Sequence, residues 1–65
     1  MTAAMKNWLH ERGLTAITVM RTAGIWDTHY FYRMLNGKKK VTQELRDTLC
    51  RVYGMTEKEY KEAIP

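Results

Sequence analysis

Four polar side chains of different chemistry are grouped between residues 28 and 33 of this 65-residue chain: Thr28, His29, Tyr32 and Arg33. Their spacing of i, i+1, i+4 and i+5 places them on one face of a helix. Hydroxyl, imidazole and guanidinium groups recognise base edges in the DNA major groove, and arginine can bond guanine O6 and N7 together. Tyr32 has the chemistry to contact a thymine methyl or a phosphate. We therefore expect this stripe to contact DNA bases.

The residues between these positions supply an apolar stripe on the opposite side of the same segment: Tyr30, Phe31, Met34 and Leu35. Asp27 is a good N-cap because its carboxylate can accept backbone N–H bonds and complements the helix dipole. Gly37 is placed to end the helix in the left-handed region. The pattern predicts a helix over 27–36 with one face buried and the other presented outward.

Three consecutive lysines, Lys38, Lys39 and Lys40, follow this helix directly. Lysines beside a base-reading helix supply salt-dependent, sequence-independent affinity for DNA phosphates. We expect Asn36, and Thr15 at the start of the preceding helix, to contact phosphates as well. Three alternatives stay open: the lysines form a solubilising loop, His29 is simply solvated, and Tyr32 covers the edge of the core.

The rest of the chain predicts short helices that support this one. Each of the four glycines follows a segment of helical period, and the sole proline, Pro65, is the last residue, so the pattern predicts an all-α fold of five helices in a single domain over 1–65. The expected N-caps are Thr2, Thr15, Asp27, Thr42 and Thr56. The other expected inner stripes are Met5, Trp8 and Leu9; Ala16, Val19, Met20 and Ala23; Leu45, Leu49, Val52 and Tyr53; and Tyr60 with Ile64. Thr56 and Glu59 form a capping-box pattern, with Met55 and Tyr60 spaced as a hydrophobic staple. Only the β-branched content of residues 14–19 disagrees with helix.

Composition argues against several classes of function. The net charge of +4 favours a polyanionic partner. A single cysteine, Cys50, excludes an intrachain disulfide and fits the cytoplasm, or the nucleoid of a bacterial or phage-infected host. We expect Cys50 to be a small buried core residue.

Two histidines with one cysteine give no metal-ligand spacing, and no glycine-rich phosphate loop occurs, so neither a cofactor nor an enzyme is expected. Short apolar stretches and the absence of a signal-like start predict no membrane segment.

Three segments resemble the Cro/repressor-like helix-turn-helix family of phage and bacterial transcriptional regulators. Residues 5–15 resemble its first helix and the Gly-Leu-Thr turn, Leu35-Asn36-Gly37-Lys38 resembles the close of its recognition helix, and Leu49 to Thr56 resembles its fourth helix and the following turn. The resemblance implies a compact five-helix, lambda-repressor-like fold with the helix-turn-helix at helices two and three, operator binding, often as a homodimer, and control of transcription. By position it implies base reading by Thr28, His29 and Arg33 and backbone contacts by Lys38 and Lys40.

Two positions depart from the family pattern. Met20 stands where the family prefers a small residue, and the turn is one residue longer, with Ile25 and Trp26 before Asp27. A bulky Met20 would separate the two helices, and the longer turn would absorb that shift. The docking angle of the helix over 27–36 therefore cannot be carried over from the family.

The patterns support two functional hypotheses. The first is a sequence-specific, double-stranded DNA-binding transcriptional regulator of phage or mobile-element type. The alternative is a protein-binding helix-turn-helix module of antirepressor or antitoxin type, with little DNA specificity. It would bind its partner protein through Trp26, Tyr30 and Tyr32. Its motivation is the concentration of aromatic residues around the helix over 27–36, which is typical of interface anchors.

Overall fold

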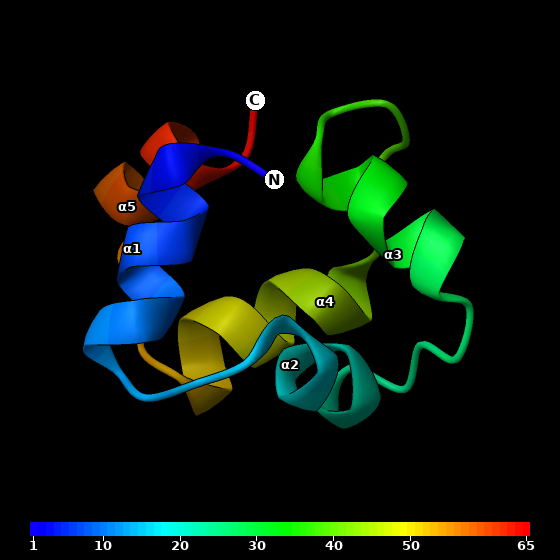
Figure 1. Cartoon of the computed structure of the whole chain (residues 1–65), viewed down its shortest axis with the longest axis horizontal. Helices are drawn as coiled ribbons and strands as arrows, with labels where there is room; N and C mark the ends of the chain where they lie inside the picture. The colour runs from blue at the N-terminus through cyan, green and yellow to red at the C-terminus, as the bar shows by residue number, and fades with distance from the viewer.

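The computed structural model describes all residues from Met1 to Pro65 and contains helices joined by short connections, with no strand. The elements are α1 (Ala3–Glu11), α2 (Ala16–Thr22), α3 (Thr28–Leu35), α4 (Gln43–Asp47), a π-helical turn η1 (Thr48–Val52) and α5 (Glu57–Ala63). This confirms the predicted all-α class with five α-helices. In Figure 1, α1 and α5 lie side by side and the two chain ends lie near each other. The Thr2 hydroxyl joins these ends by donating to the carbonyl of Ala63 at 2.6 Å.

All five predicted N-caps are confirmed. In each, the capping side chain accepts the backbone N–H three residues later, at 3.1–3.2 Å, and the caps are Thr2, Thr15, Asp27, Thr42 and Thr56. Glu59 reciprocates by accepting from the backbone N–H of Thr56 at 2.9 Å, which completes the capping box. A cap of this kind stabilises a helix by about 1 kcal/mol. The caps therefore define where these short helices begin.

One cluster of fifteen buried residues forms the core: Met5, Trp8, Leu9, Val19, Met20, Ala23, Ile25, Phe31, Met34, Leu35, Leu45, Leu49, Met55, Ala63 and Ile64. It draws on every α-helix, and α1 packs on α5 while α2 packs on η1. Most of the predicted inner stripes are confirmed, because the apolar residues recur at the helical period. Tyr30, Tyr53 and Tyr60 are partly buried at the edge of this cluster.

The prediction that Val52 lies on the inner stripe is wrong, because the chain makes a π-helical turn there. The backbone N–H of Tyr53 donates to the carbonyl of Thr48, five residues back, at 3.1 Å. The wider turn shifts the following residues away from the α-helical register. As a result Val52 is 61% exposed. Cys50, which we expected to be buried, is only partly so.

The connection between α2 and α3 accommodates both departures noted in the sequence. Met20 and Ile25 are both buried in the core, and the Ile25 N–H donates to the Met20 carbonyl at 3.0 Å. Trp26, the next residue, is 78% exposed. The longer connection thus adds one side chain to the core and presents the next one to solvent.

The longest helix, α1, has nine residues, and none of the helices has the length and apolar character that crossing a bilayer would require.

Candidate nucleic-acid interface

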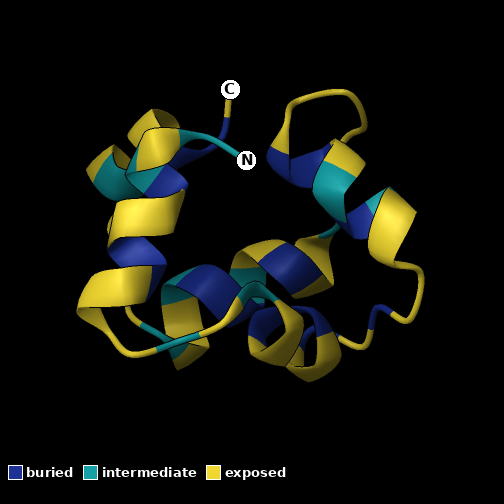
Figure 2. Ribbon diagram, viewed as in Figure 1, coloured by how far each residue is buried: buried dark blue, intermediate teal, exposed yellow.

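The two faces of α3 are sharply divided. Phe31, Met34 and Leu35 have no exposed surface, whereas Thr28, His29 and Arg33 are exposed. The Asp27 carboxylate accepts the backbone N–H of Tyr30 at 3.2 Å and so sets the first turn of the helix. Figure 2 shows buried and exposed positions following one another along α3. We call Thr28, His29, Tyr32 and Arg33 the outer face of α3; the buried stripe anchors it to the core.

Tyr32 is the one member of the outer face that is partly buried. Its ring lies edge-on to the Phe31 ring, with centroids 5.4 Å apart and an interplanar angle of 71°. An arrangement of this kind is favourable between aromatic rings. The ring of Tyr32 therefore covers the edge of the core, in agreement with the alternative interpretation of this residue. It exposes less of its surface on the outer face than Thr28, His29 and Arg33 do.

Asn36 and Thr15, the other two residues predicted to contact phosphates, already have local partners. The side-chain oxygen of Asn36 accepts a hydrogen bond from the ammonium group of Met1. The Thr15 hydroxyl accepts the backbone N–H of Thr18 at 3.2 Å and lies 2.8 Å from the Thr18 hydroxyl. Both residues are exposed. Thr15 at the start of α2 acts as the helix cap, and the structure does not bring it to the lysine run.

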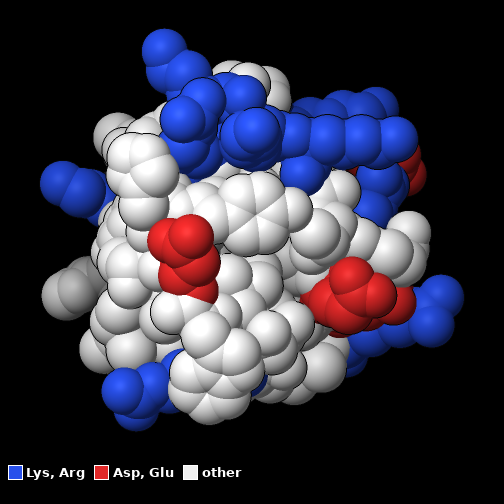
Figure 3. Space-filling view, turned by 90° about the vertical axis from the view of Figure 1, so that its right-hand side faces the viewer, with Lys and Arg blue, Asp and Glu red and all other residues white.

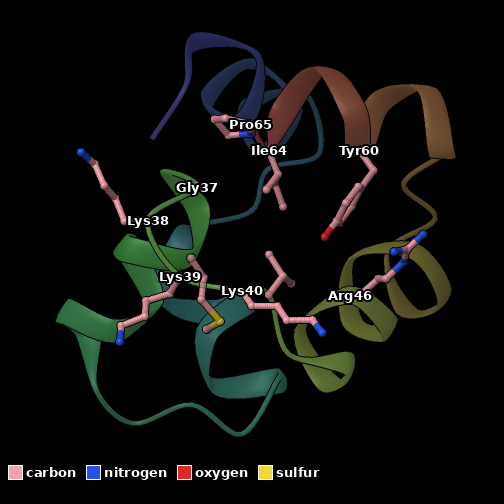
Figure 4. Close-up of a pocket in the computed structure, with 10 residues that line it drawn as sticks. Gly37, Lys38, Lys39, Lys40, Arg46, Tyr60, Ile64 and Pro65 are labelled. Carbon is pink, nitrogen blue, oxygen red and sulfur yellow. The ribbon is translucent and has the colours of Figure 1, made fainter.

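The three lysines line a pocket of about 410 Å³ between the connection that follows α3 and the end of α5. We call this the basic pocket; its lining is Met34, Gly37, Lys38, Lys39, Lys40, Val41, Arg46, Tyr60, Ile64 and Pro65. The positive φ of Gly37, +76°, turns the chain so that the lysines follow α3 at once, and the Lys38 N–H donates to the Arg33 carbonyl at 2.8 Å. Figure 4 shows Lys40 extending toward Arg46, while Lys38 and Lys39 extend away from it.

Arg46 and Tyr60 belong to this pocket although no sequence pattern pointed to them as site residues. The Arg46 guanidinium lies over the Tyr60 ring, 5.0 Å from its centroid, and the Tyr60 hydroxyl points toward the space between α5 and the lysines (Figure 4). Burial raises the pKa of Tyr60, and the nearby Arg46 charge only partly opposes that effect. The phenol therefore stays neutral at physiological pH and can donate a hydrogen bond to an anion.

The cations of this region have no acidic partner. The four ion pairs of the structure use Arg12, Arg51 and Lys61 as their cations. No Asp or Glu side chain lines the basic pocket. Figure 3, which looks at the α3 side of the molecule, shows Lys and Arg side chains gathered along its upper edge. This uncompensated positive charge favours a polyanion at the pocket and beside the outer face of α3.

The candidate interface thus consists of the hydrogen-bonding helix face, Thr28, His29 and Arg33, and of a pocket lined by the lysines that follow this helix in the chain. Comparison of the chain with protein-family models, with curated proteins and with solved structures found no match.

Proposed function

We propose that this protein binds double-stranded DNA in a sequence-specific manner and regulates transcription, with α2 and α3 acting as a helix-turn-helix of the Cro/repressor-like kind. One observation carries the proposal: the outer face of α3 presents hydrogen-bonding side chains from a helix whose other side is fully buried, and unpaired cations follow it directly. A helix that reads DNA needs this combination of a rigid support, polar groups aimed outward and a positively charged flank.

The outer face of α3 would supply the base contacts. Eight residues make a helix about 12 Å long, which matches the width of the major groove, about 12 Å. Thr28 and His29 lie in its first turn, and Arg33 lies about one turn further on. Arg33 has no carboxylate partner, so its guanidinium is free to take a guanine in a bidentate contact.

The basic pocket would hold the DNA backbone. Lys40 and Arg46 flank the Tyr60 hydroxyl, so that two positive charges and a neutral donor face the same space. A phosphate oxygen seated there gains charge-assisted hydrogen bonds. Such contacts position the protein without reading sequence, and they make its affinity fall as salt rises.

The test is selection of bound duplexes from a random pool at physiological salt, with the wild-type chain, Arg33→Ala and Arg51→Ala. Arg51 is a matched control because it is an exposed arginine on η1, paired with Asp47 at 3.8 Å. We expect the wild type and Arg51→Ala to enrich the same short motif and Arg33→Ala to lose preference at one position. A pool that stays random with the wild type would overturn the proposal.

The same selection reports how many copies of the chain bind. Two half-sites with inverted symmetry, about one helical turn apart, would mark a homodimer on its operator. A single short half-site would mark a monomer. Either result is compatible with a repressor that blocks polymerase by occupying the site.

A further inference from the structure

A second pocket, of about 420 Å³, lies at the α2–α3 connection and differs in character from the basic pocket. We call it the acidic groove; its lining is Ala23, Gly24, Ile25, Trp26, Asp27, Tyr30, Thr42 and Glu44. It contains two carboxylates, two aromatic rings and no lysine or arginine. It shares no lining residue with the basic pocket.

The aromatic part of the groove is unusually open to solvent. Trp26 is 78% exposed, whereas Trp8, the other tryptophan, is 4% exposed. Tyr30 packs against the edge of the core, and Ile25 is buried beneath the connection. Large aromatic side chains left in water beside an apolar floor are typical of interaction surfaces, where they act as anchors.

The groove also carries two carboxylates that form no ion pair within the chain. One Asp27 carboxylate oxygen accepts the Tyr30 N–H, and Glu44 makes no side-chain hydrogen bond or ion pair. This is notable in a chain with a net charge of +4. A ligand with complementary charge must therefore be a cation.

We propose that the acidic groove docks an arginine- or lysine-bearing segment of a partner protein. The cationic head would lie against the ring of Trp26 or Tyr30, where the aromatic quadrupole attracts it, and would pair with Asp27 and Glu44. Arginine fits better than lysine because its planar guanidinium can stack on a ring and bind a carboxylate at the same time. An apolar neighbour in the segment would cover Trp26.

Charge decides between the candidate occupants. DNA phosphates are repelled by Asp27 and Glu44, so the groove does not extend the DNA surface. A second copy of this chain would have to bring its own cations to the groove while carrying the same net charge of +4, so the two copies repel each other overall. Because the groove contains no residue of the outer face or of the basic pocket, docking of a partner segment there can be tested separately from DNA binding.

The experiment titrates the full chain with a capped peptide, Gly-Leu-Arg-Leu-Arg-Gly, and with its counterpart in which glutamine replaces arginine. Binding is followed by the backbone amide shifts of the groove residues in two-dimensional NMR. We expect the arginine peptide alone to shift the resonances of Tyr30 and Glu44. Trp26→Ala and Glu44→Gln should each weaken binding by roughly threefold or more, the size of an exposed cation–π or ion-pair contact.

Two control variants separate the groove from general charge and surface effects. Glu62→Gln removes the same charge from an exposed position of α5, and Val52→Ala trims another exposed apolar side chain. Both should bind the arginine peptide as the wild type does, and the amide spectra verify that every variant is folded. Equal binding of the two peptides, or equal weakening by Glu62→Gln and Glu44→Gln, would overturn the proposal. Sedimentation that shows self-association lost in Trp26→Ala would also overturn it, because the occupant would then be a second copy.

Discussion

The Arg46 guanidinium lies over the ring of Tyr60, with 5.0 Å between its central carbon and the ring centroid. This contact joins α4 to α5 and places a cation beside the phenol at the wall of the basic pocket. Stacking on the ring also restricts the arginine side chain, so less of its rotamer entropy is lost when an anion binds. Arg46 is therefore a better-ordered candidate for binding an anion than Lys38, Lys39 and Lys40, which make no ion pair.

The first prediction concerns this arginine. Arg46→Gln should weaken DNA binding by a similar factor on every duplex, because it removes a phosphate contact. The slope of log K against log salt should become shallower by about one unit. Affinity measured over a series of salt concentrations tests this, with Arg51→Gln as the control that leaves the slope unchanged. A loss restricted to the preferred duplex would show that Arg46 reads bases instead.

Arg33 should behave in the opposite way. Arg33→Ala should cost roughly 1–3 kcal/mol on the preferred duplex and much less on unrelated DNA, because a bidentate base contact is lost. Competition between the preferred duplex and variants with one base pair changed tests the prediction. In the mutant, one base position should cease to matter. If affinity falls equally on all duplexes, Arg33 contacts the backbone and the outer face of α3 has been assigned wrongly.

The π-helical turn gives a prediction for stability. Leu49 is fully buried, so Leu49→Ala should lower the free energy of unfolding by about 2–5 kcal/mol. Val52→Ala should change it by no more than about 0.5 kcal/mol, because Val52 is 61% exposed. Urea unfolding at neutral pH measures both values. A continuous α-helix that buried Val52 would instead make the two losses comparable.

Glu59 predicts a specific pH dependence. The Thr56 backbone N–H holds the pKa of Glu59 below its ordinary value of 4.5; desolvation opposes this, and the Thr56 hydroxyl and Arg12 reinforce it. Because the folded pKa is the lower one, the stabilisation is complete above pH 4.5 and is lost as the pH falls through the folded pKa.

Glu59→Gln keeps a side chain that can cap but removes the titrating group. We therefore expect it to lose less stability than the wild type when urea unfolding is repeated between neutral pH and about pH 3. Glu62→Gln, on the same helix, serves as the control for removal of one charge. A wild-type pH dependence in Glu59→Gln would show that other carboxyl groups dominate acid unfolding.

Local chemistry explains why so much of the fold could be predicted. A cap such as Asp27 acts on the N–H of Tyr30, three residues away, and Gly37 ends α3 through its own backbone angle. The buried stripe of α3 is also predicted from local sequence, since Phe31, Met34 and Leu35 recur at the helical period. These features depend on neighbours within a single turn, so the order of residues is sufficient to indicate them. The outer face of α3 follows as the complement of the buried stripe.

Three features were decided only by packing between distant segments. The π-helical turn rotates Val52 outward, a change that α-helical periodicity cannot anticipate. The basic pocket forms because α5 returns beside the lysines and brings Tyr60 under Arg46, fourteen positions apart in the chain by the difference of their numbers. The acidic groove forms because Glu44 of α4 lies beside Trp26 and Asp27. Hydrogen bonds within a turn are encoded by adjacent residues, whereas a pocket depends on how whole helices share one core.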